Sequence, residues 1–232
     1  MTDHKDITKA KRGEHMYLFS LDGPLWRFFN LVYQLVVLHV LWIIYSLPLF
    51  TIGASTTALY YACMKMIRTK EGYVHRNFHH AFKENFKQAT IIWLAVAAGV
   101  FLLITNLRFG IFLGNAIGKL ILIGNSVILI PFFLICMYIF PVQAKFENRI
   151  LDNVKNALIL SFRHFPCSLL LVIIYGSLIL ITVSFPPFFA LMLFCGTGIA
   201  AYLSSNVFIY IFRKYLPDEL ANDLEKSGES FD

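Results

Sequence analysis

The sequence has little charge for its length. Asp, Glu, Lys and Arg together make up only 15% of the 232 residues, whereas a soluble domain typically has about 25%. Hydrophobic residues make up 58%, against a usual value of about 45–50%. Because a soluble domain of this size needs a charged surface, the composition excludes a soluble enzyme and a disordered chain. It indicates an all-α, polytopic membrane protein.

Cysteines and catalytic motifs are also scarce. The four cysteines lie in or beside apolar stretches and none forms a C-x-x-C pair, so we expect neither a disulfide framework nor a zinc site. The chain holds no Walker motif, no H-E-x-x-H and no G-x-S-x-G. His75 and His79 have the spacing of two metal ligands on a helix, but we expect them to contact lipid headgroups. We predict no catalytic residue, no metal and no cofactor.

Six apolar stretches approach the length of about 20 residues that a helix needs to cross a bilayer. They cover residues 28–47, 51–67, 90–107, 120–142, 167–184 and 188–212. None contains Asp or Glu, and Lys65 near the end of the second stretch is the only Lys or Arg in them. The pattern therefore predicts six transmembrane helices, of which the second is the shortest and weakest.

Basic residues set the orientation of these crossings. Lys and Arg concentrate in the arm 1–27 and in the connections 68–87 and 145–163, whereas the opposite side has only Arg108 and Lys119. By the positive-inside rule, both termini are expected to face the cytoplasm. The chain then consists of a cytoplasmic arm (1–27), a six-helix membrane domain (28–212) and an acidic cytoplasmic tail (213–232). A five-crossing arrangement would place the basic connections on opposite sides.

Two inner connections show an amphipathic helical pattern. Residues 74–89 carry apolar side chains four residues apart with basic residues off that stripe, and residues 147–165 repeat the arrangement. We predict two elbow helices in the membrane interface, and their similarity indicates an internal repeat. They either rest on lipid headgroups or dock a partner. The candidate docking residues are Phe78, Phe82, Lys83, Phe86, Lys87, Phe162, Arg163 and Phe165.

Uncharged polar residues lie within the apolar stretches. The main ones are His39, Asn125 and Asn206. In a bilayer such groups usually hydrogen-bond a neighbouring helix. The alternative is that they line a path for a solute.

The first 95 residues also carry a set of short motifs. These are Leu18-Phe19-Ser20, Asp22-Gly23-Pro24-Leu25-Trp26-Arg27, Leu47-Pro48-Leu49-Phe50-Thr51-Ile52-Gly53-Ala54, Gly72-Tyr73 and Phe82-Lys83-Glu84-Asn85-Phe86. Together they resemble the YesL family of bacterial integral membrane proteins. The resemblance implies a link to carbohydrate-uptake ABC transporters, and it implies no catalytic residue.

Two functions follow as hypotheses. The first is a non-enzymatic accessory subunit that binds the permease subunits of an ABC importer. The second is a carrier or channel that acts alone on a small solute. The net charge of +6 fits anionic lipid at the inner leaflet, so the bilayer is the expected partner and nucleic acid is not.

Overall fold

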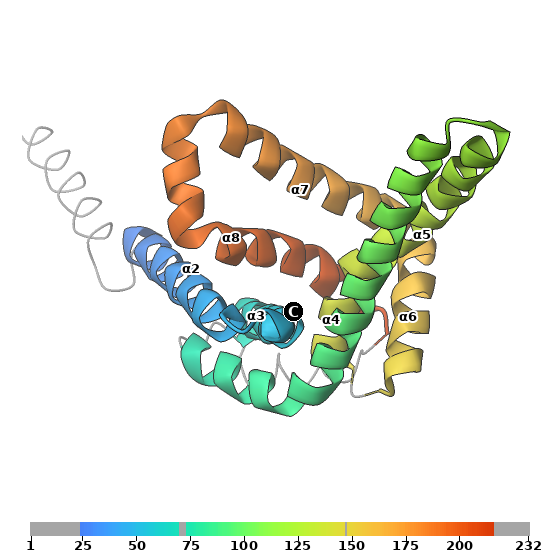
Figure 1. Ribbon diagram of the computed structural model, residues 1–232. Helices are drawn as coiled ribbons and strands as arrows, with labels where there is room; N and C mark the ends of the chain where they lie inside the picture. The colour runs from blue at the N-terminus through green and yellow to red at the C-terminus, as the bar shows by residue number, and fades with distance from the viewer. Residues whose placement is uncertain (1–23, 70–72, 147, 216–232) are drawn as a thin grey trace, which may run out of the picture.

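The computed structural model describes residues 24–69, 73–146 and 148–215, and this part is helical with no strand (Figure 1). Nearly all of the predicted arm 1–27, Glu147 and the tail from residue 216 lie outside the described residues. In chain order the elements are α2 (Pro24–Ser46), the 3-10 turn η1 (Leu49–Thr51), α3 (Ile52–Thr69), α4 (Val74–Leu113), α5 (Ala116–Lys145), α6 (Ile150–Arg163), α7 (Phe165–Ser184) and α8 (Pro186–Arg213). The all-α prediction is confirmed.

Five of these helices are long and apolar enough to span a membrane. They are α2, α4, α5, α7 and α8. The second predicted crossing, 51–67, corresponds to α3, which is not among them. Most of α3 is buried, and it packs against α2, α4, α5 and α8. Because protein surrounds it, α3 can carry polar residues such as Ser55 and Thr57 that a lipid-facing helix would avoid.

Helix α4 differs from the prediction. Residues 74–89 and 90–107 were expected to form a separate elbow and a separate crossing, but they belong to one helix of 40 residues. No proline lies in this segment and its first glycine is Gly99, so nothing in the sequence ends a helix near residue 89. The helix bends (Figure 1) and ends at Gly114, whose φ of 60° is the left-handed conformation of a helix C-terminus.

The second predicted elbow, 147–165, is shorter in the structure. Helix α6 begins at Ile150 after the extended Arg149 and ends at Arg163. His164 separates it from α7, so Phe165 opens the next helix. Pro166 suits this start, because a helix tolerates proline in its first turn.

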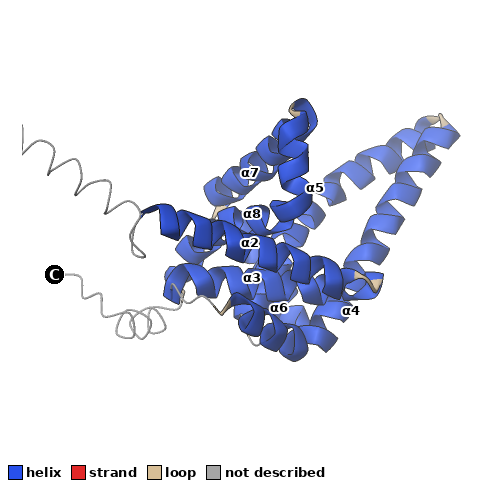
Figure 2. Ribbon diagram, turned by 90° about the vertical axis from the view of Figure 1, so that its left-hand side faces the viewer, coloured by secondary structure: helices blue, strands red, loops and turns tan. Residues whose placement is uncertain are grey.

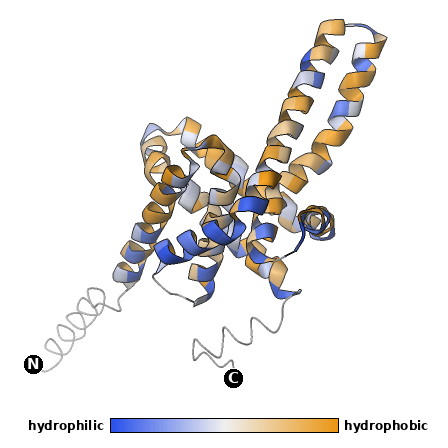
Figure 3. Ribbon diagram, turned by 60° about the horizontal axis from the view of Figure 1, so that its bottom comes forward, coloured by the Kyte–Doolittle hydropathy of each residue, from blue (hydrophilic) through white to orange (hydrophobic). Residues whose placement is uncertain are grey.

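Two helical hairpins, α4–α5 and α7–α8, project from a common base. In Figures 1 and 2 they diverge from each other. The base contains α6, the first part of α4, the C-terminal end of α3 and the inner ends of α5 and α8. Figure 3 shows hydrophilic residues gathered at this base and mostly hydrophobic residues along the α4–α5 hairpin. The buried core also lies towards the base, around Phe78, Tyr138 and Phe208.

The hairpins bury little of their apolar surface. In the most apolar stretch of α4 only 6% of residues are buried, and in α5 and α7 the share is 11%. In water such surface would cause aggregation. The arrangement therefore requires lipid, or helices of another membrane protein, around the hairpins.

Two glycines test one of the helix contacts. A Cβ at Gly198 on α8 would lie 2.5 Å from the carbonyl oxygen of Leu35 on α2, whereas a Cβ at Gly176 on α7 would meet nothing within 4 Å. We expect Gly198→Ala to lower the free energy of unfolding by about 1–3 kcal/mol, because the two helices must move apart. The control Gly176→Ala should leave it unchanged or raise it by up to about 1 kcal/mol. Thermal unfolding in detergent, followed by circular dichroism, measures the difference. Equal stabilities would contradict the α2–α8 contact.

Candidate functional site

A network of side-chain amides, partly buried, joins three helices at the base. Gln143 of α5 is only 3% exposed. Its Nε2 donates to Asn85 Oδ1 at 3.0 Å and to Gln88 Oε1 at 2.8 Å, both on α4. Its Oε1 accepts from Asn153 Nδ2 of α6 at 2.5 Å. One residue thus connects the first part of α4 to α6.

This network brings the two predicted elbow segments to the same end of the molecule. The outer part of α4 leads away from the base and α5 returns to it (Figure 1). The shared location of the two segments agrees with the distribution of Lys and Arg in the sequence, which predicts both connections on one side of the membrane. The amide network was not predicted, because amides carry no charge and show no hydrophobic period. The spacing of Asn85 and Gln88, three residues apart on one helical face, was the available signal.

The apolar stripe of the first segment faces the protein interior. Phe78 is fully buried, and its ring packs edge-on against Tyr45 of α2 at 5.4 Å between centroids. Phe82 packs on the same tyrosine at 4.7 Å, and Phe86 packs on Phe82 at 5.4 Å. These rings hold α4 against α2, so Phe78 offers no surface to a partner. His79 also contacts Tyr45, with its Nδ1 2.6 Å from the hydroxyl.

The candidate docking residues that stay exposed are split between two places. Lys83 and Lys87 are exposed on α4. At the junction of α6 and α7, the exposed fraction is 54% for Phe162 and 58% for Phe165. The two segments therefore differ despite their similar sequences, because α2 covers the apolar stripe of the first.

His164 lies at this junction with a cationic neighbourhood. Its Nε2 is 3.0 Å from the hydroxyl of Tyr215, and the guanidinium of Arg163 lies 5.7 Å from the centre of the Tyr215 ring. Partial burial, with smaller effects from Lys214 and Arg163, lowers the pKa of His164 below its usual value. Any contribution of the neutral imidazole to stability is thus present above about pH 6.5 and is lost as the pH falls through the lowered pKa.

The three intramembrane polar candidates are not brought together. His39 of α2 is buried and bonds α8 through Thr197 Oγ1 at 2.7 Å and the carbonyl of Leu193 at 2.8 Å. Asn206 is exposed on α8 and donates to the carbonyl of Tyr202 at 2.7 Å. Asn125 is buried on α5, within the α4–α5 hairpin. His39 therefore links two helices, and the three residues share no hydrogen bond.

An apolar groove of about 510 Å³ lies between the hairpins. Its walls include Phe133 and Met137 of α5 and Val172 and Gly176 of α7. Tyr60 of α3 forms its floor, where its hydroxyl lies 2.5 Å from that of Tyr175. The groove therefore opens at the depth of the apolar helices and not at the polar base.

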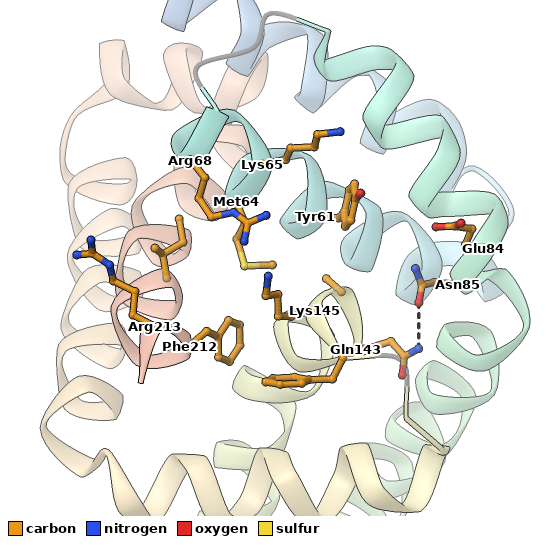
Figure 4. Close-up of a pocket in the computed structure, with 13 residues that line it drawn as sticks. Tyr61, Met64, Lys65, Arg68, Glu84, Asn85, Gln143, Lys145, Phe212 and Arg213 are labelled. Carbon is orange, nitrogen blue, oxygen red and sulfur yellow. Dashed lines mark hydrogen bonds between the residues drawn. The ribbon is translucent and has the colours of Figure 1, made fainter. Parts of the chain in front are cut away.

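A second cavity, of about 250 Å³, lies in the base (Figure 4). Its lining includes Lys65 and Arg68 of α3, Lys145 of α5, Arg213 of α8 and Glu84 of α4. In Figure 4 the side chains of Arg68 and Lys145 extend toward the middle of the cavity from different helices. The sequence placed these cations in basic connections without indicating that they converge.

The amide network has a direct test. We expect Gln143→Leu to lower the free energy of unfolding by about 1–3 kcal/mol, because the amide of buried Asn153 loses its partner. The exposed Asn206→Ala should change it by less than about 0.5 kcal/mol. Titration with a denaturing detergent gives both values. A Gln143→Leu protein as stable as the parent would show that the network does not hold the base together.

Residues 35–107 match a family model described as "Protein of unknown function, DUF624". The match runs from within α2 to the outer part of α4 and covers less than half of the chain. Comparisons with curated proteins and with solved structures gave no match. The family match is consistent with a membrane protein, and the resemblance to the YesL family stays a prediction.

Proposed function

We propose that the chain is a non-enzymatic membrane subunit that associates with a second integral membrane protein. The resemblance in the sequence suggests the permease of a carbohydrate-uptake ABC importer as that partner. The observation that carries the proposal is the pair of diverging hairpins, which leave a membrane-depth groove between α5 and α7.

The groove has the character of a helix-binding site. Its lining is mainly apolar, and Gly176 leaves open space in its α7 wall. Small residues let helices approach closely in a bilayer, where dispersion contacts drive their association. A transmembrane helix of the partner therefore fits between the hairpins, while the base faces the soluble side.

We further propose that α3 crosses the bilayer, which gives six crossings with both termini in the cytoplasm. The α4–α5 and α7–α8 hairpins each leave the base and return to it, so they do not decide the side of the N-terminus. The N-terminus lies on the same side as the base only if α3 crosses the bilayer. Five basic residues in the arm, Lys5, Lys9, Lys11, Arg12 and Arg27, favour the cytoplasm.

Reporter fusions test this topology. We expect reporters fused at residue 1, inserted at residues 147–149 and fused after residue 215 to lie on the same, cytoplasmic side. A reporter at 114–115, in the turn between α4 and α5, serves as the control and should lie outside. If the reporter at residue 1 joins the control on the outer side, α3 does not cross.

The association itself is tested by gentle purification from the native host. We expect an ABC permease subunit to co-purify with the parent chain. Gly176→Leu fills the groove and should reduce the recovered permease roughly tenfold, the effect of about 1–3 kcal/mol of overpacking. Gly124→Leu is the matched control, because Gly124 also has open space around it but does not line the groove. Equal recovery with both variants would contradict docking in the groove.

The alternative function, a stand-alone carrier or channel, predicts a different result. It requires a polar path through the bundle. His39, Asn125 and Asn206 are not brought together, so these three residues do not form such a path. Sugar flux into vesicles that contain this chain alone would favour the carrier over the accessory subunit.

A further inference from the structure

The polar and apolar residues of α6 are not arranged as on a helix that faces water. The face that packs against the protein is partly polar, because it includes the fully buried Asn153 and Ser161. The opposite face carries an apolar strip of Leu151, Ile159 and Phe162, of which Leu151 is 73% exposed and the other two are more than half exposed. A helix at a water-facing surface instead buries its apolar residues and exposes its polar ones. The exposed apolar strip therefore suits a solvent other than water.

Charged residues lie within and beside the apolar strip. At about 100° per residue, Lys155 projects from within the strip, whereas Asp152 and Arg163 lie along one edge of it. All three are exposed. Apolar side chains interleaved with cations are typical of a helix that lies in the interface of an anionic membrane. The long stem of a lysine can then lie along lipid while its ammonium group reaches the headgroups.

Helix α7 locates the boundary of the bilayer relative to α6. It has 20 residues, and at 1.5 Å per residue its length of about 30 Å equals the thickness of the hydrocarbon layer. Its first residue, Phe165, therefore lies at the boundary on the side of the base. Only His164 separates α7 from α6. The C-terminal end of α6, with Phe162, thus lies at the same boundary.

Buried hydrogen bonds hold α6 in a fixed orientation at this junction. Ser168 Oγ of α7 donates to the carbonyl of Ser161 at 2.8 Å and lies 2.8 Å from the hydroxyl of Tyr138 of α5. All three residues are buried. Helix α6 lies at the edge of the molecule (Figure 1), and among the described helices it packs mainly against α5 and α7. Its apolar strip therefore stays on the outside of the protein.

The first part of α4 has a different exposed surface. Between residues 74 and 89 the exposed side chains are all polar or charged, namely His75, Arg76, His79, His80, Lys83, Glu84 and Lys87. The apolar side chains of this segment are buried or half-buried. This surface suits water, so the two segments with similar sequences meet different surroundings.

We propose that α6 is a lipid-binding helix. It inserts its apolar strip into the leaflet on the side of the base, and Lys155 binds the phosphate of an anionic lipid headgroup. Lipid suits the strip better than a second protein does, because the strip contains a cation and leads directly into α7, whose most apolar stretch is only 11% buried. None of these residues lines the groove between the hairpins, so the proposal does not depend on the proposed partner.

Photocrosslinking of the full chain in membranes of the native host tests the insertion. The photoreactive residue p-benzoylphenylalanine replaces Ile159 or Phe162, and in a control it replaces Lys83 on the exposed face of α4. We expect mass spectrometry to detect lipid adducts at both strip positions and none above background at the control position. Adducts mainly with another protein or with a second copy of the chain, or a lipid yield no higher than at the control position, would overturn the proposal.

A second measurement tests the headgroup contact in vesicles with equal amounts of phosphatidylcholine and phosphatidylglycerol. With the crosslinker at position 162, we expect Lys155→Gln to lower the ratio of phosphatidylglycerol to phosphatidylcholine adducts about fivefold, which corresponds to about 1 kcal/mol for one cation at an anionic surface. The matched control Lys83→Gln removes the same charge from α4 and should leave the ratio unchanged. If the two variants give the same ratio, Lys155 does not bind the headgroup.

Discussion

The hydrogen bonds of Gln143 are the interaction on which the rest of the structure depends. A buried amide without partners costs several kcal/mol in an apolar environment, so it constrains its surroundings strongly. Gln143 meets this constraint by bonding α4 and α6 at once. The base is therefore a polar junction with fixed geometry, and the hairpins that extend from it carry the apolar residues.

The burial pattern of the molecule follows from this division. Helix α3 is mostly buried, and its threonines form hydrogen bonds inside the protein: Thr57 Oγ1 donates to the carbonyl of Gly53 at 2.9 Å, and Trp42 Nε1 donates to Thr56 Oγ1 at 3.2 Å. The outer helices instead expose their apolar side chains. A soluble protein would show the opposite arrangement, because water solvates polar groups and excludes apolar surface. In lipid the outer surface favours apolar side chains, whereas polar groups in the interior still need hydrogen-bond partners.

Helix α3 also connects the two cavities. Tyr60 forms the floor of the apolar groove, and the next residue, Tyr61, lines the basic cavity together with Met64. Adjacent residues on a helix point about 100° apart, so a single turn of α3 faces both. The groove and the basic cavity thus lie on neighbouring faces of one buried helix, and the hydropathy of α3 predicts neither of them.

The sequence by itself determined the helical class, the long apolar stretches and the position of the basic connections, because helix period, length and charge are local properties of the chain. It also placed the apolar stripe of residues 74–89 on one helical face. Only the tertiary structure decided what that stripe contacts: Phe78 and Phe82 pack on Tyr45, which lies 33 and 37 positions earlier in the chain. The amide network of Gln143 and the convergence of Arg68, Lys145 and Arg213 were likewise decided there. These features depend on contacts between residues far apart in the chain, and hydrophobic periodicity carries no information about which helices become neighbours.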